Sequence, residues 1–197
     1  MARLIIMGPP GSGKGTQAEH IARHFGIPAI STGDLFRAHV RDKTELGLEA
    51  GEYMDRGEFV PDHVTTDMLK QRMEEADAAQ GFLLDGYPRT VIQIGALDEM
   101  LAVRGQPLEV VLALTASDDE LVARMLRRAQ EQGRSDDTET VIQRRLELYA
   151  DETRPVLMAY ANRGILLTVD GSGDRESITE AAIAALEGAL AGQALPG

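Results

Sequence analysis

A glycine-rich stretch near the start of the chain stands between an apolar run and a helical pattern. It reads Gly8-Pro9-Pro10-Gly11-Ser12-Gly13-Lys14-Gly15-Thr16 and follows the run Leu4–Met7. After it, apolar residues recur at the i, i+3, i+4, i+7 spacing of an amphipathic helix, at Ala18, Ile21, Ala22 and Phe25. A buried strand that passes through a glycine-rich loop into a helix predicts the first unit of a parallel α/β fold.

The same stretch predicts a phosphate site. Its glycines let the backbone bend around an anion, the helix N-terminus adds a positive dipole end, and Lys14 can reach the outer phosphates. It departs from the general G-x-x-x-x-G-K-[ST] form, because Gly15 follows the lysine and the hydroxyl comes one place later, at Thr16. The alternative is a glycine-rich turn with an incidental lysine, and the strand–loop–helix context favours the phosphate site.

Short apolar runs separated by helical patterns extend the prediction to a whole domain. Together they indicate a doubly wound α/β fold, a five-stranded parallel sheet flanked by helices. The predicted strands are Leu4–Met7, Ile27–Ile30, Phe82–Leu84, Val110–Leu114 and Ile165–Val169.

Helix boundaries are predicted from capping patterns. Ser117 with Glu120 and Ser177 with Glu180 form capping-box patterns, so a helix is expected to begin at each serine. Gly105 and Gly164 fall where helices should stop. We expect Pro155 to start a helix, with Thr153 as its cap.

Two intervals break the alternation of strand and helix. From Ser31 to Pro61 two helix candidates follow one another without a strand, and Ala129 to Asp136 is short and polar. Ligands of open α/β sheets bind beyond the carboxyl ends of the strands. Both intervals are therefore expected to project there and cover a ligand.

Composition excludes several classes of protein. The net charge of −12 disfavours wrapping a nucleic acid or lying on an anionic membrane, so any anion site must gather positive charge locally. No apolar run approaches the roughly 18 residues of a membrane span. With no cysteine there is neither a disulfide nor a thiolate metal site.

Asp85 ends the predicted strand Phe82–Leu84 and is followed by Gly86. A carboxylate at that place beside a phosphate loop can hold magnesium or its waters, with the Thr16 hydroxyl on the other side. The alternative is an Asp-Gly turn at the end of a strand.

Five arginines spread along the sequence are candidate phosphate ligands: Arg37, Arg89, Arg128, Arg134 and Arg145. Arg145 is the informative case, because it lies within the apolar arc of its predicted helix and such an arginine needs an anionic partner. Asp137 is predicted to cap that helix, whereas the role of Asp136 is left open.

Four blocks together resemble adenylate kinases, members of the nucleoside monophosphate kinase family. They occur in the family order from Met1 to about Leu190, and the first is the phosphate loop with its Gly15–Thr16 departure. The others are Ser31-Thr32-Gly33-Asp34-Leu35-Phe36-Arg37, Leu84-Asp85-Gly86-Tyr87-Pro88-Arg89-Thr90 with Gln93, and Gly133-Arg134-Ser135-Asp136-Asp137 leading to Arg145. The resemblance implies reversible phosphoryl transfer from Mg-ATP to AMP, giving two ADP.

The resemblance also assigns residues to each substrate. It implies ATP binding by Gly11, Ser12, Gly13, Lys14, Gly15, Thr16, Arg128 and Gly173. It implies AMP binding by Thr32, Arg37, Glu58, Phe59, Val60, Gly86, Tyr87, Pro88, Arg89, Gln93, Arg134 and Arg145, with Gln93 at the base edge. The catalytic set is Lys14, Arg89, Arg128, Arg134 and Arg145, and magnesium is expected near Thr16 and Asp85.

The implied organisation is one domain over 1–197. Its core comprises 1–30, 61–127 and 137–197, its monophosphate-binding lobe 31–60, and its short lid 128–136. The short, cysteine-free lid implies no structural zinc.

We expect a cytoplasmic monomer without nucleic-acid or membrane partners. The alternatives are a UMP/CMP kinase, with which Tyr87 is compatible, and a nucleotide switch without an acceptor.

Overall fold

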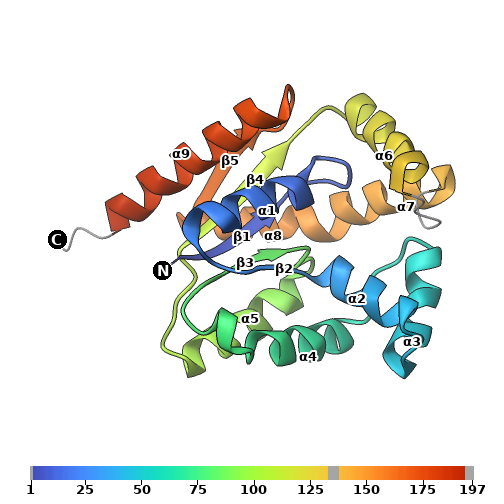
Figure 1. Ribbon diagram of the computed structural model, residues 1–197, viewed down its shortest axis with the longest axis horizontal. Helices are drawn as coiled ribbons and strands as arrows, with labels where there is room; N and C mark the ends of the chain where they lie inside the picture. Colours follow the sequence, from blue (N-terminus) through green and yellow to red (C-terminus); the bar gives the residue numbers. More distant parts are fainter. Residues whose placement is uncertain (1, 133–137, 194–197) are drawn as a thin grey trace.

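The structure, a computed structural model, describes residues 2–132 and 138–193 (Figure 1). Its sheet is parallel throughout, with the strand order β2-β3-β1-β4-β5. The strands are β1 Arg3–Met7, β2 Ala29–Ser31, β3 Phe82–Asp85, β4 Val110–Thr115 and β5 Leu166–Asp170. The predicted five-stranded parallel fold is confirmed, and strand ends differ from the prediction by one or two residues. Ile27 is the clearest shift, because its N–H closes the end of the first helix on Ala22 O at 3.0 Å.

Helices occupy the intervals between strands. They are α1 Lys14–Phe25, α2 Thr32–Arg41, α3 Glu45–Asp55, α4 Asp62–Met73, α5 Val91–Val103, α6 Asp118–Gln132, α7 Glu139–Leu148, α8 Arg154–Asn162 and α9 Arg175–Gln193. A short 3₁₀ turn, Ala76–Ala78, precedes β3, and a π turn, Tyr149–Thr153, joins α7 to α8. In this described part of the chain no helix has the length and apolar character that crossing a membrane requires.

The side chains of β1 alternate between the two faces of the sheet. Leu4 and Ile6 point to the layer made by α1 and α9, and Ile5 and Met7 point to the layer made by α4, α5 and α8. All four are at most 4% exposed. A strand that is buried on both faces has to be apolar at every position, which is why these runs do not alternate with polar residues.

Two helix pairs lie beyond the carboxyl ends of the strands, α2 with α3 and α6 with α7 (Figure 1). Each pair has a small apolar cluster apart from the two large ones. Phe36, Ala50 and Met68 centre the first cluster, and Leu121 and Met125 centre the second. The two helices predicted between Ser31 and Pro61 are thus present. The segment predicted as a short lid begins inside a helix, since α6 continues to Gln132.

Several helix ends differ from their predicted caps. The predicted capping box at Ser177 and Glu180 is wrong, because α9 begins two residues earlier and Ser177 lies inside it. The Ser177 N–H and hydroxyl both donate to the carboxylate of Asp174, at 2.9 and 2.6 Å. Aspartate is at least as good an N-cap as serine, and here it reaches two donors at once.

The helices around Pro155 give a second correction. Pro155 does stand in the first turn of α8, as predicted, but Thr153 makes no side-chain cap. Its hydroxyl instead donates to the carbonyl oxygen of Arg89 at 3.0 Å. The cap of α7 is Thr138, which accepts from Val141 N, and not the predicted Asp137. Gly105 and Gly164 follow α5 and α8 with φ of 61° and 73°, so both predicted helix stops are confirmed.

Candidate functional site

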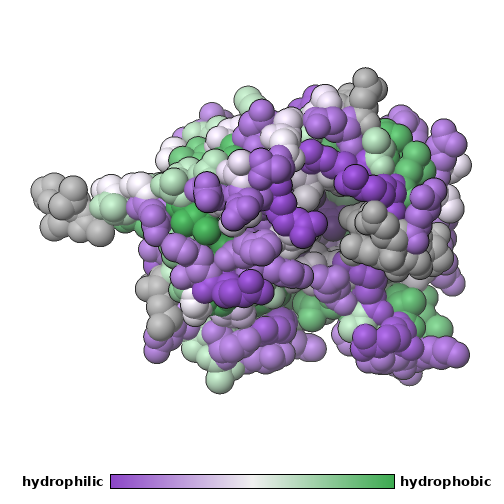
Figure 2. All heavy atoms as spheres, turned by 45° about the horizontal axis from the view of Figure 1, so that its top comes forward, coloured by the Kyte–Doolittle hydropathy of each residue, from purple (hydrophilic) through white to green (hydrophobic). Residues whose placement is uncertain are grey.

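A cavity of about 1310 Å³ opens at the carboxyl edge of the sheet. Its walls come from the loop after β1, from α2, from the loop after β3, and from α6 and α7. In Figure 2 the recess has hydrophilic residues around its rim. Small-molecule sites usually enclose roughly 300–1,000 Å³. This cavity is large enough for more than one such ligand.

The structure brings nearly all the predicted site residues to this one cavity. Those that line it are Gly11, Ser12, Gly13, Lys14, Gly15, Thr16, Thr32, Arg37, Glu58, Phe59, Val60, Asp85, Gly86, Tyr87, Pro88, Arg89, Gln93, Arg145 and Gly173. Arg134, Asp136 and Asp137 lie outside the described residues. Arg128 belongs to α6, but its side chain is not among those described.

The loop after β1 is shaped to surround an anion. Gly13 has a left-handed backbone, with φ 89°, immediately before the first residue of α1. Gly11 has φ 84°, and a Cβ placed there would stand 2.6 Å from the carbonyl oxygen of Leu121. The Ser12 hydroxyl is buried with no hydrogen-bond partner among the described residues. The loop therefore packs against α6 and keeps an unsatisfied polar group at its centre.

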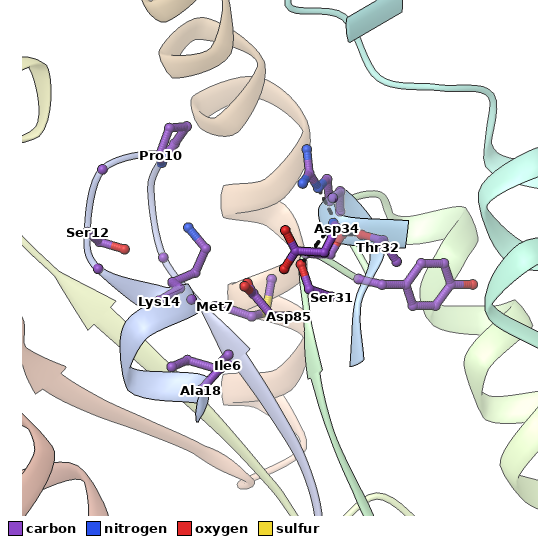
Figure 3. Close-up of a pocket in the computed structure, with 18 of the residues that line it drawn as sticks. Ile6, Met7, Pro10, Ser12, Lys14, Ala18, Ser31, Thr32, Asp34 and Asp85 are labelled. Carbon is purple, nitrogen blue, oxygen red and sulfur yellow. Dashed lines mark hydrogen bonds between the residues drawn. The ribbon is translucent and has the colours of Figure 1, made fainter. Parts of the chain in front are cut away.

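Lys14 and Asp85 line the same part of the cavity (Figure 3). Lys14 Nζ donates to the carbonyl oxygen of Pro9 at 2.9 Å. Burial raises the pKa of the Asp85 carboxyl, while the positive charges of Lys14 and Arg89 oppose that rise. Among the residues described, no group donates a hydrogen bond to this carboxylate. A partly buried acid of this kind is suited to a cation that arrives with a ligand.

Arg89 is held at the end of β3 by two contacts. Its Nε donates to the carbonyl oxygen of Gly86 at 2.8 Å, and its guanidinium lies 5.2 Å from the centre of the Phe59 ring. Burial lowers the pKa of Arg89, and repulsion from Arg145 and Arg37 lowers it further. Three guanidinium groups therefore share one region of a strongly acidic chain. A bound anion would relieve their repulsion.

Gly86 is a site where only glycine fits. Its φ is 82°, and an added Cβ would lie 2.8 Å from Thr32 Oγ1 and 3.0 Å from Arg89 Nη2. Its carbonyl oxygen accepts from Thr32 Oγ1 at 3.0 Å as well as from Arg89. This one peptide therefore connects α2 with the arginine.

Gln93 lies at the first turn of α5 and is 2% exposed. Its Oε1 accepts from the backbone N–H of Arg89 at 2.7 Å, and its Nε2 donates to Asp62 Oδ1 at 2.7 Å. Both ends of the amide are thus fixed by the protein. Arg37, in contrast, is only partly buried, and its guanidinium pairs with Asp34 three residues earlier.

A family model described as adenylate kinase matches residues 6–165. The chain belongs to the adenylate kinase family. An adenylate kinase from Kocuria rhizophila is 56% identical over 187 residues, covering 95% of this chain and 100% of the relative. One from Pseudarthrobacter chlorophenolicus is 56% identical over 191 residues, covering 97% and 100%. One from Bifidobacterium longum is 54% identical over 185 residues, covering 94% and 100%.

Four arginines that line the cavity of this adenylate kinase family member were not predicted from the sequence: Arg72, Arg124, Arg127 and Arg175. Arg124 and Arg127 line the cavity from α6, and Arg124 Nη1 also donates to the carbonyl oxygen of Gly171 at 2.9 Å. With Glu120 and Ala123 they follow the i, i+3, i+4, i+7 spacing of one helix face. This stripe lies next to the buried face that carries Leu121 and Met125. The spacing of these polar residues was a usable signal in the sequence.

Proposed function

We propose that this chain transfers the terminal phosphoryl group of Mg-ATP to AMP and so forms two ADP, and that it does so in the cavity at the carboxyl edge of its sheet. The observation that carries this is the pairing of two cationic walls in one cavity. One wall is the phosphate loop with Lys14, and the other is the cluster of Arg37, Arg89 and Arg145. A nucleotide switch needs at most one such arginine of its own, whereas a transferase must neutralise two polyanions.

The phosphate loop is assigned to ATP. Gly11 to Thr16 supply backbone N–H groups and the N-terminal end of α1, which together favour phosphate oxygens. Lys14 gives a positive charge at the outer phosphates, and the Ser12 hydroxyl, which has no hydrogen-bond partner among the described residues, is available to the same anion. Arg128 and Gly173 complete this half of the site, with Gly173 beside the adenine.

The opposite wall is assigned to AMP. Thr32, Arg37 and the segment Gly86–Arg89 hold the phosphate and sugar, and Glu58, Phe59 and Val60 face the base. Gln93 reads the base edge. This assignment is supported by the position of these residues around one part of the cavity and by the stacking of Arg89 on Phe59. Arg134 and Arg145 are assigned to the phosphates that are exchanged.

Magnesium is assigned to the region of Thr16 and Asp85, with water between them and the ion. The partly buried Asp85 carboxylate, to which no described residue donates a hydrogen bond, fits this role, because carboxylate and hydroxyl oxygens suit a hard cation. When bound, the ion neutralises charge on the phosphates of ATP. No zinc site is proposed, since the chain has no cysteine.

The reaction needs positioning and charge more than acid–base chemistry. The phosphate of AMP is ionised near neutral pH, so no base has to remove a proton from it. Lys14, Arg89, Arg128, Arg134 and Arg145 stabilise the charge of the group in transfer. Water is the competing acceptor, which makes closure of the site necessary.

Closure is assigned to two parts of the chain. The monophosphate-binding lobe is 31–60, the lid is 128–136, and the core is 1–30, 61–127 and 137–197. The small apolar cluster that Phe36, Ala50 and Val60 form with Met68, apart from the two large clusters of the sheet, supports the lobe as a separate unit. The 187-residue match with the Kocuria rhizophila enzyme covers that relative along its whole length, and this supports a short lid. We propose that the enzyme works as a cytoplasmic monomer without nucleic-acid or membrane partners.

The test measures ADP formation from Mg-ATP with AMP, UMP, CMP, GMP or no acceptor, in parallel. The expected result is a rate that requires AMP and a reverse reaction from ADP alone. A preference for UMP or CMP would overturn the assignment of the base pocket and leave the fold unchanged. Equal slow hydrolysis with every acceptor would identify a nucleotide switch instead.

A further inference from the structure

Asp62 is outside the cavity, yet one of its carboxylate oxygens binds the residue that is to read the base and the other binds the cap of the same helix. Oδ1 accepts from Gln93 Nε2 at 2.7 Å, and Oδ2 accepts from Thr90 Oγ1 at 2.9 Å. Thr90 Oγ1 in turn accepts from the backbone N–H of Gln93 at 3.2 Å and caps α5. These contacts close a ring that connects the start of α4 to the start of α5.

The ring leaves the Gln93 amide only one orientation. A carboxylate can only accept a hydrogen bond and a backbone N–H can only donate one. The Asp62 side therefore requires the Nε2 end of the amide, and the Arg89 N–H at 2.7 Å requires the Oε1 end. Turning the amide by 180° would place its oxygen against the Asp62 carboxylate, two acceptors, and its NH₂ group against the Arg89 N–H, two donors. Because Gln93 is 2% exposed, water cannot compensate for this mismatch.

After these two bonds the amide keeps one N–H and one oxygen lone pair for a ligand. Adenine presents a donor at its 6-amino group next to an acceptor at N1. A 6-oxopurine presents the reverse, an acceptor at O6 next to a donor at N1. A freely turning amide could pair with either edge. An amide fixed in orientation distinguishes them.

We propose that Asp62 is a positioning residue for base specificity: together with the Arg89 N–H it fixes the Gln93 amide so that the site accepts an adenine edge and rejects a 6-oxopurine edge. This inference rests on the proposed function. Asp62 acts through Gln93 and touches no substrate itself, so its loss should change selection among monophosphates and leave ATP binding as it is.

The experiment compares AMP with inosine 5′-monophosphate, which differs from AMP only at position 6 and N1. For the wild type, Asp62→Ala, Asp62→Asn and Asp67→Ala, kcat and KM are measured for each monophosphate and for ATP. Asp67→Ala is the matched control, because it removes an exposed aspartate from the same helix. Thermal unfolding establishes that each variant is folded, and Asp62→Leu replaces Asp62→Ala if the alanine variant is not.

We expect Asp62→Ala to lower the selectivity for AMP, given by kcat/KM for AMP divided by kcat/KM for inosine monophosphate, on the order of tenfold. This change should lie in the KM values of the two monophosphates. KM for ATP should not change. Asp62→Asn should keep the wild-type ratio, since its amide oxygen can still accept from Gln93 while its NH₂ donates to Thr90. Asp67→Ala should keep it within about twofold.

A folded Asp62→Ala enzyme with the wild-type ratio would overturn the inference. An equal increase of KM for both monophosphates leaves the ratio unchanged and would overturn it as well. That result would leave AMP-dependent ADP formation, and so the proposed function, intact. A wild-type enzyme that forms no ADP with AMP would overturn the proposed function and this inference with it.

Discussion

The hydroxyl of Thr153 donates a 3.0 Å hydrogen bond to the carbonyl oxygen of Arg89. Thr153 ends the π turn between α7 and α8, and it is 6% exposed. The helix that carries Arg145 is thus attached, through this turn, to the loop that carries Arg89. Two arginines from distant parts of the sequence are placed relative to each other by one buried hydroxyl.

Replacing Thr153 by valine should cost about 1–2 kcal/mol of unfolding free energy, because the Arg89 carbonyl oxygen loses its donor in a buried place. It should also raise KM for AMP, because the position of Arg89 is less fixed. Urea unfolding and steady-state kinetics measure the two effects. Thr168→Val changes an exposed threonine of β5 and should stay within about 0.5 kcal/mol. Equal effects of the two substitutions would contradict the role given to Thr153.

Lys14→Met should lower kcat on the order of 10² or more, because it removes a positive charge from the phosphate loop and keeps the length of the side chain. The variant should remain folded, because methionine keeps the aliphatic part of the side chain, and thermal unfolding checks this. Lys70→Met, on the exposed side of α4, is the matched control. Near-normal turnover in folded Lys14→Met would refute the assignment of this lysine.

Gly86→Ala should destabilise the protein by about 1–2 kcal/mol, because alanine disfavours a left-handed backbone. The added methyl would also press on Thr32 and Arg89, so KM for AMP should rise. Gly188→Ala is the control, and its change in the free energy of unfolding should have the opposite sign. It lies within α9 with open space around its Cβ position, and it should stabilise by about 0.5–1 kcal/mol. Denaturant titrations of the two variants check both signs.

Asp85→Asn should leave the ligand-free protein at least as stable as the wild type, because a neutral amide replaces a partly buried carboxylate that receives no donor from the residues described. Turnover with Mg-ATP should fall on the order of 10², by loss of charge at the metal. Unfolding in EDTA and kinetics across a magnesium titration separate the two effects. Lower stability in EDTA would show that the carboxylate is needed for the fold itself.

The layers and the cavity were predictable because they depend on a repeated alternation of apolar runs and helical patterns along the chain. The apolar runs Leu4–Met7 and Val110–Leu114 have the length of buried strands, and parallel strands place their carboxyl ends, with Lys14 and Asp85, at one edge. The family resemblance then gave the remaining residues around that edge. Their collection in one cavity follows from the topology.

Local choices between similar donors and acceptors were not predictable. Ser177 and Asp174 both satisfy the rules for an N-cap, and only the path of the loop after β5 decides between them. Gln93 was predicted to face a base, but its ties to Asp62 and Arg89 depend on how α4 and α5 meet, about which sequence spacing carries no information. Single hydrogen bonds differ too little in free energy to leave a pattern in the sequence.

The separate apolar clusters of the α2–α3 and α6–α7 pairs make the molecule divisible in its energetics. Phe36 and Met125 contribute to clusters distinct from those that line the sheet, although Leu35 packs against both the α2–α3 cluster and a sheet cluster. The free energy of opening a helix pair and the free energy of global unfolding therefore depend on largely different side chains. Selection can therefore change how readily either pair loosens, and with it the rate at which product leaves, while the sheet with α1, α5, α8 and α9 keeps its stability.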